Sequence, residues 1–262
     1  MAEPEMKIVE TPKGRIAYRE AGSGPVLVCL HGLGGGARSW MRQLEGLSDR
    51  RRVIAWDCPG YGGSDDYPSK IPTPAHYADA VIAMLDGIGV TGEFDLVGHS
   101  MGGAIAPQIV AGHPGRVRRL VMSATRIAFQ KWEGYQERLR EHASMAPEEF
   151  GATRVKSMCS PDAPIAAKTA VASIASEIRG PGYAAAVHLL SVCNNEKELK
   201  AMQLPVLVLA GAEDRIAPEA ETAALTAIIK DARREIIGQA AHAAYLEQSA
   251  AYNSCLTVFL DA

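Results

Sequence analysis

The sequence predicts an α/β protein in which helices cover both faces of a largely parallel sheet. Short runs of mostly apolar residues recur along the chain, at 26–30, 53–56, 94–97, 120–122 and 206–209. Strands without polar alternation are typical of parallel sheets that are buried on both faces. Segments with helical spacing of apolar residues lie between most of these runs, and this alternation indicates crossover helices.

The remaining elements can be placed in order. Two alternating runs, 7–10 and 15–19, flank a Thr-Pro-Lys-Gly turn and predict an opening hairpin. Helical spacing is found at about 38–48, 75–89, 101–112 and 218–230. A last short strand is expected at 234–237, followed by a loop to residue 242 and a final helix.

One long interval interrupts this alternation. Between Met122 and Val206 no segment is a convincing strand, whereas 131–146, 147–158, 163–178 and 183–200 have helical spacing. Breaks are expected at Pro147, at Pro161 and at residues 180–182. We therefore expect a core domain of residues 1–124 and 201–262 and a helical cap insertion of residues 125–200. Asn194 and Asn195 should lie near its return to the core.

Composition limits the functional classes. The chain has 262 residues, of which 47% are hydrophobic and 22% charged, and its net charge is −3. No basic run is present, so neither nucleic acid nor an anionic membrane is an expected partner. Five scattered cysteines without CxxC spacing, no basic leader and no apolar run of membrane-spanning length predict a cytoplasmic protein with free thiols. The oligomeric state is left open.

The most informative motif is Gly98-His99-Ser100-Met101-Gly102, which lies between a predicted strand and a predicted helix. A serine at such a corner is held in a tight turn with its hydroxyl clear of the backbone. The flanking glycines are needed because side chains there would strike the strand and the helix. Ser100 is therefore the candidate nucleophile.

A serine hydroxyl needs a base to accept its proton, and that base is usually a histidine oriented by a carboxylate. Asp214 follows the strand 206–209, and His242 follows the strand 234–237, so both should reach the same sheet edge as Ser100. Glu213 is the alternative acid, although it needs a different loop geometry. Ser100, Asp214 and His242 are the expected catalytic residues.

A glycine-rich turn, His31-Gly32-Leu33-Gly34-Gly35-Gly36, follows the strand 26–30. Such a turn lets main-chain N–H groups point inward, and the N–H groups of Leu33 and Met101 are the expected oxyanion donors. A phosphate loop is excluded because no Gly-Lys-Ser/Thr follows the glycines. His/Cys clusters with metal spacing are lacking, so we expect neither a metal nor a cofactor.

Taken together, these segments resemble the α/β-hydrolase superfamily over nearly the whole chain. The order Ser100, Asp214, His242 is that of the family. The resemblance implies an eight-stranded, mostly parallel sheet with a helical cap, and among its members small esterases and lactonases of the 3-oxoadipate enol-lactonase type are the most similar. One departure is Ala241, where members often have glycine. The matching segments are residues 31–35, 57–65, 98–103, 211–214 and His242.

The leading interpretation is a serine hydrolase that transfers the acyl group of a small ester or lactone to Ser100 and then to water. A carbon–carbon bond hydrolase of ring-cleavage products is the alternative, but its members usually have Asn and Trp where this chain has His99 and Ala243. A perhydrolase side activity and a slow-turnover ligand receptor of the same fold also remain open.

Candidate substrate contacts come from the predicted cap. Phe129 and four further residues are candidates for the pocket lining, although aromatic side chains in helices more often pack against neighbouring helices. Arg126 and Arg179 flank the cap and could attract a carboxylate, but exposed arginines without such a role are common. The four further candidates are Trp132, Tyr135, Tyr183 and His188.

Overall fold

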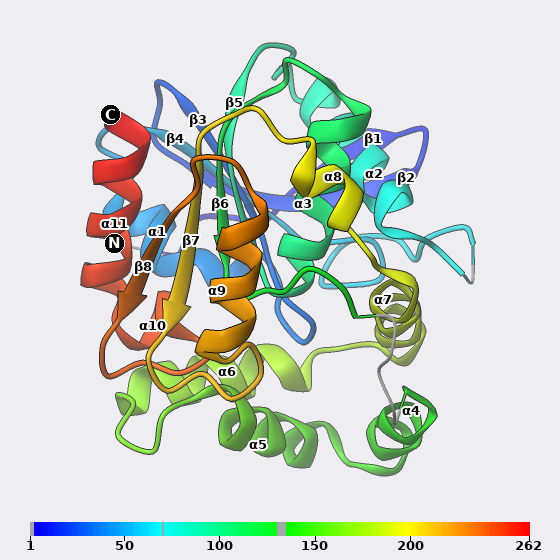
Figure 1. Cartoon of the computed structure of the whole chain (residues 1–262). Coiled ribbons are helices and arrows are strands. Elements are labelled where there is room, and N and C mark those ends of the chain that lie inside the picture. Colours follow the sequence, from blue (N-terminus) through cyan, green and yellow to red (C-terminus); the bar gives the residue numbers. More distant parts are fainter. Residues whose placement is uncertain (1–2, 70, 130–134) are drawn as a thin grey trace.

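The computed structural model describes residues 3–69, 71–129 and 135–262 and contains one eight-stranded sheet. Its strand order is β1-β2-β4-β3-β5-β6-β7-β8 (Figure 1). The expected α/β-hydrolase fold is confirmed, with an antiparallel β1–β2 hairpin, β2 antiparallel to β4, and parallel pairing from β4 to β8. The strands are β1 (Lys7–Thr11), β2 (Gly14–Ala21), β3 (Val26–Leu30), β4 (Arg52–Trp56), β5 (Phe94–His99), β6 (Val117–Ser123), β7 (Val206–Gly211) and β8 (Arg233–Ile237).

Helices cover both faces of this sheet (Figure 1). One face packs on α2 (Pro74–Gly87), α3 (Met101–Gly112), α8 (Glu196–Lys200) and α9 (Glu219–Ile228), and the other on the 3₁₀ helix η1 (Ala37–Trp40), α1 (Met41–Gly46), α10 (Ala244–Glu247) and α11 (Ser249–Asp261). Within β3, Val28 and Leu30 belong to the hydrophobic core on the face covered by α2 and α3. Leu27 and Cys29 belong to the core on the face covered by α1 and α11. This alternation explains why the central strands are apolar at consecutive positions.

The segment between β6 and β7 contains α4 (Tyr135–Ser144), α5 (Pro147–Met158), α6 (Ile165–Ser176) and α7 (Gly180–Val192). These helices lie beyond the carboxyl ends of the strands (Figure 1). Because nucleophile, acid and base are all expected at these strand ends, α4–α7 are placed to cover the site. Residues 125–200 are called the cap segment below.

Two helix boundaries in the cap segment differ from the sequence expectation. Residues 180–182 were expected to break the helix, but α7 begins there, because proline fits the first turn of a helix. The expected continuous helix 183–200 is wrong: α7 ends at Val192 and α8 begins at Glu196. Between them, Asn195 donates from Nδ2 to the Ala104 carbonyl at 2.8 Å and ties the chain to α3.

In the described part of the chain, no helix is long and apolar enough to span a membrane.

Candidate active site

Ser100 occupies the turn between β5 and α3, with φ 51° and ψ −110°. A positive φ is unfavourable for a residue with a Cβ, and non-glycine residues of this kind are concentrated at functional sites. The turn depends on close backbone contacts: a Cβ on Gly98 would lie 2.5 Å from the Gly102 carbonyl oxygen, and one on Gly102 would lie 2.3 Å from that of Leu30. Glycine is therefore required on both sides of the serine.

The backbone of this turn is anchored to the neighbouring strand β6. The Ser100 N–H donates to the Ser123 carbonyl at 2.9 Å, and the Thr125 hydroxyl donates to the Ser100 carbonyl at 2.9 Å. The Ser100 side chain remains available to the cavity described below.

Asp214 and His242 form a buried hydrogen-bonded pair. Asp214 Oδ2 lies 2.9 Å from His242 Nδ1, and both side chains are at most 2% exposed. Oδ1 of Asp214 accepts the N–H groups of Ile216 and Ala217 at 2.8 and 2.9 Å. Because Nδ1–H donates to the carboxylate, Nε2 of a neutral His242 is the nitrogen that can accept a proton.

The carboxylate of this pair is held in its charged form. Burial by itself raises the pKa of Asp214, but His242 and the Ala217 and Ile216 N–H groups outweigh it, so the pKa lies below its ordinary value. Asp214 is consequently ionised at neutral pH.

Glu213, the alternative acid, points elsewhere. Its Oε2 accepts the Ser160 hydroxyl at 2.6 Å. The Ser160 N–H also donates to Oε2 of Glu247 at 2.8 Å, which fixes the position of Ser160. Of the two adjacent carboxylates, Asp214 is therefore the one that contacts the histidine.

His31 connects two loops beside Ser100. The Cys58 N–H donates to His31 Nε2 at 3.1 Å, so Nδ1 carries the proton and donates to the Gly32 carbonyl at 2.9 Å. Burial lowers the pKa of His31, which favours this neutral form. The histidine thus braces the glycine-rich turn that contains Leu33.

Leu33 and Met101 are both buried next to Ser100. Met101 is the first residue of α3, and the first N–H groups of a helix have no partner within the helix. Leu33 lies in the turn closed by the hydrogen bond from the Gly35 N–H to the Gly32 carbonyl at 2.9 Å. These positions suit the role of oxyanion donors expected for the two N–H groups.

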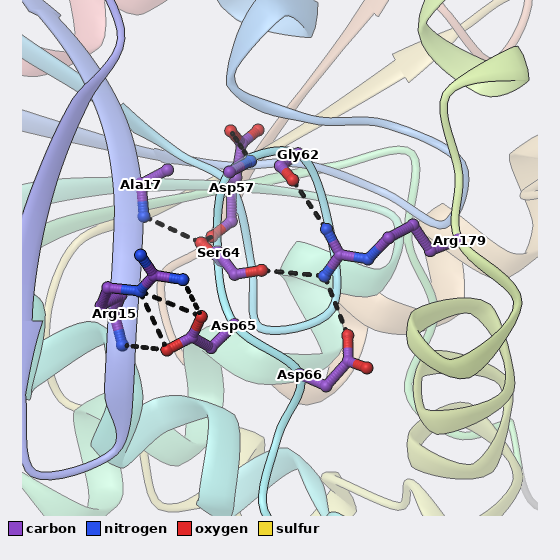
Figure 2. Close-up of polar contacts among 9 residues, drawn as sticks. Arg15, Ala17, Asp57, Gly62, Ser64, Asp65, Asp66 and Arg179 are labelled. Carbon is purple, nitrogen blue, oxygen red and sulfur yellow. Dashed lines mark hydrogen bonds and ion pairs between the residues drawn. The ribbon is translucent and has the colours of Figure 1, made fainter.

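The loop after β4 is joined to the cap segment by Arg179 (Figure 2). Its guanidinium donates to the carbonyls of Gly62 and Ser64 and to Asp66, each at 2.8 Å. Arg179 is therefore engaged in holding the start of α7 on this loop and does not line the cavity at Ser100. Asp65 in the same loop pairs with Arg15 at 2.9 Å and so joins the loop to β2.

A cavity of about 390 Å³ lies over Ser100 and His242. Its apolar wall is formed by Leu33, Phe129, Leu190 and Ile216.

The predicted substrate contacts mostly fall elsewhere. Tyr183 is 2% exposed and stacks on His142 with ring centroids 4.5 Å apart, away from the cavity lining. His188 Nδ1 lies 3.2 Å from the Pro72 carbonyl and is also outside the lining. Tyr183 therefore packs within the cap segment, whereas His188 joins the cap segment to the loop before α2. Trp132 lies outside the described residues, and for Tyr135 only its place at the start of α4 is described.

Arg154, in α5, is a lining residue that the sequence expectations missed. It is 8% exposed, although arginine is rarely buried. A signal was present in the sequence: Phe150, Arg154 and Met158 recur every four residues and share the buried face of α5. An arginine at an apolar position of a helix is unusual enough to be noted.

The described residues contain no group of three or more His, Cys, Asp or Glu side chains that could hold a metal ion.

Comparisons with known proteins agree with this fold. The 2-hydroxymuconate semialdehyde hydrolase of Pseudomonas sp. (strain CF600) is 28% identical over 270 residues, covering 94% of this chain and 90% of that protein. The enol-lactonase from Burkholderia xenovorans LB400 superposes with a TM-score of 0.90 at 21% identity, covering 98% of this chain and 100% of the other. An esterase from Thermogutta terrifontis superposes with a TM-score of 0.89 at 24% identity, covering 98% of each chain.

Residues 25–249 match the family model described as the alpha/beta hydrolase fold. This match includes Ser100, Asp214, His242 and the whole cap segment. The chain belongs to the alpha/beta hydrolase family.

Proposed function

We propose that the protein is a serine hydrolase that cleaves a small carboxylic ester or lactone through an acyl-enzyme on Ser100. The observation that carries this proposal is the combination of a positive-φ serine between β5 and α3 with the buried Asp214–His242 pair at the same cavity. Because Asp214 accepts a hydrogen bond from Nδ1 of His242, Nε2 of His242 is left as the base that accepts the serine proton.

In the first half-reaction, Ser100 Oγ attacks the carbonyl carbon while its proton passes to His242 Nε2. The carbonyl oxygen becomes an oxyanion, which the N–H groups of Leu33 and Met101 stabilise. The imidazolium then gives its proton to the departing alkoxide as the C–O bond breaks. In the second half, water attacks the acyl-enzyme while its proton passes to His242 Nε2. The imidazolium then gives this proton to Ser100 Oγ as the acyl–Oγ bond breaks, and the acid is released.

The size of the cavity supports a small substrate. A volume of about 390 Å³ lies at the lower end of the range for ligand pockets. This volume favours short acyl groups, so acyl groups of a few carbons and simple lactones are the proposed substrates.

A fluorophosphonate probe tests the nucleophile directly. Wild type should be labelled once, and Ser100→Ala should not be labelled; labelling of Ser100→Ala at another serine would refute the assignment. In hydrolysis of p-nitrophenyl acetate, Ser100→Ala and His242→Ala should each lower kcat by on the order of 10⁶, and the double variant little more. Stoichiometric labelling without turnover of any ester or lactone would favour the slow-turnover receptor.

Carbon–carbon bond hydrolysis is the second candidate, because a relative of 28% identity over most of the chain is a 2-hydroxymuconate semialdehyde hydrolase. The two candidates are separated by assaying p-nitrophenyl esters from acetate to palmitate beside simple lactones and a vinylogous diketone. Cleavage of the diketone without esterase activity would select the second candidate. Peak kcat/KM at acyl chains of twelve carbons or more would contradict a small substrate.

A further inference from the structure

Arg154 places a buried positive charge at the wall of the cavity that contains Ser100 and His242. Its Nη2 donates to the Leu33 carbonyl at 3.3 Å, while its Nε is buried with no hydrogen-bond partner among the described residues. A buried guanidinium is costly unless it is paired with an anion and its N–H groups are satisfied.

No carboxylate in the described part of the chain pairs with Arg154; the Leu33 carbonyl is its one hydrogen-bond acceptor there. The ionisable groups that most affect its pKa are Arg138 and the tyrosines Tyr183, Tyr61 and Tyr245, and none of these is a carboxylate. Burial lowers the pKa of Arg154, and Arg138 lowers it further, which is the opposite of what a neighbouring carboxylate would do. Among the described residues, the charge is thus left without a counter-charge.

Three further arginines line the same cavity. Arg126, Arg138 and Arg215 also line the cavity, whereas the lining residues that the structure describes include no Asp or Glu. Arg126 is partly neutralised, because Glu221 lies 4.0 Å away and the Ile216 carbonyl accepts from it. A cavity lined by charges of one sign attracts ligands of the opposite sign.

We propose that Arg154 binds a carboxylate of the substrate, so that the enzyme acts on small esters or lactones that carry a free acid group. This inference rests on the proposed function, because it takes Ser100 as the reacting residue. The planar guanidinium matches the geometry of a carboxylate and forms charge-assisted hydrogen bonds with it. Arg154 is then a specificity-determining residue.

The contact with Leu33 positions the guanidinium relative to the reacting centre. Arg154 holds the carbonyl of the residue whose N–H is the proposed oxyanion donor, and a Cβ on Gly34 would lie 3.3 Å from Nε. The guanidinium therefore lies directly on the glycine-rich turn. A substrate that reaches both Ser100 and Arg154 has its acid group and its scissile carbonyl in the same cavity of about 390 Å³.

Two esters that differ in charge test the proposal: p-nitrophenyl hydrogen glutarate, which is anionic, and its methyl ester, which is neutral. Wild type should show a higher kcat/KM for the anionic ester. In Arg154→Gln, the ratio of kcat/KM for the anionic ester to kcat/KM for the neutral ester should fall about 10–100-fold, the range for a lost charge-assisted hydrogen bond, in addition to any loss common to both esters. Arg154→Lys should restore part of the preference because it retains the charge.

Lys156→Gln is the matched control. Lys156 is exposed on the same helix and its replacement removes the same charge, so the preference for the anionic ester should be unchanged. Binding of monomethyl glutarate is measured by calorimetry in Ser100→Ala and in Ser100→Ala/Arg154→Gln, which lack the nucleophile, and gives a second readout that does not depend on hydrolysis.

Equal losses for both esters in Arg154→Gln would show that Arg154 only supports the turn, and would overturn the proposal. Absence of any preference in wild type would overturn it as well. If neither ester is cleaved and the fluorophosphonate probe does not react, the proposed function fails. In that case, tighter binding of monomethyl glutarate to Ser100→Ala than to Ser100→Ala/Arg154→Gln would still support the carboxylate site. Equal binding to the two proteins would refute the carboxylate site.

Discussion

Replacing Asp214 by asparagine changes the proton arrangement of His242 with little change in shape. Asp214 Oδ1 accepts two backbone N–H groups, at 2.8 and 2.9 Å, and Oδ2 accepts from His242 Nδ1 at 2.9 Å. In the variant, the amide oxygen should take the place of Oδ1, because an NH₂ group there would face two donors. The amide NH₂ then points at His242 Nδ1.

An NH₂ donor facing Nδ1 selects the tautomer that has its proton on Nε2. That tautomer cannot accept the proton of Ser100, so the base is lost although the side chains are in place. A wrong tautomer of this kind costs about 10⁴ in kcat in a Ser-His-Asp site. We expect a loss of this size in Asp214→Asn, with KM changed far less.

The measurement is steady-state hydrolysis of p-nitrophenyl acetate by wild type, Asp214→Asn and Glu213→Gln. Glu213→Gln is the neighbouring control, since Glu213 accepts from Ser160 and does not contact His242. Circular dichroism and urea unfolding of each variant show whether the fold is retained.

Two results would refute this reasoning. Asp214→Asn with kcat within tenfold of wild type would show that the Asp214–His242 contact does not set the tautomer. A larger loss in Glu213→Gln than in Asp214→Asn would make Glu213 the functional acid.

Three further predictions concern stability. Ser100→Gly should be more stable than Ser100→Ala by about 1–3 kcal/mol, because glycine tolerates φ 51°; equal melting temperatures in calorimetry would argue against strain at this turn. Gly182→Ala should destabilise by about 1–3 kcal/mol in urea unfolding, since its Cβ would lie 2.0 Å from the Gly60 carbonyl oxygen. Gly180→Ala, which has no heavy atom within 4 Å of the added Cβ, should not destabilise, and similar losses in both variants would implicate helix propensity instead. Burial raises the pKa of Glu247, so the folded state holds its proton more tightly than the unfolded state does. The unfolding free energy of wild type should therefore fall, relative to Glu247→Gln, as pH rises from about 4.3 through the folded-state pKa, and a rise would contradict the sign.

Much of the fold could be predicted because its signals are local. Runs of apolar residues such as 26–30 and 206–209 identify buried parallel strands wherever they pack, and both appear in the structure as expected. The glycines around Ser100 are required by contacts within the strand–turn–helix unit, so the motif can be recognised without the rest of the chain. The end of α7 could not be predicted, because it depends on the distant contact between Asn195 and Ala104.

The candidate site, like the fold, could be predicted from the sequence only in part. The places of Ser100, Asp214 and His242 follow from the sequence, because each comes directly after a predicted strand and parallel strands end at one edge of the sheet. Which acid contacts the histidine, Asp214 or its neighbour Glu213, was decided by the loop that turns Glu213 toward Ser160. The cavity wall depends on how the cap segment folds over the sheet: aromatic residues such as Tyr183 pack within it, and Arg154 faces the cavity. Packing between segments far apart in the chain determines which polar side chains are buried without a hydrogen-bond partner. Only the tertiary structure therefore shows which side chains these are.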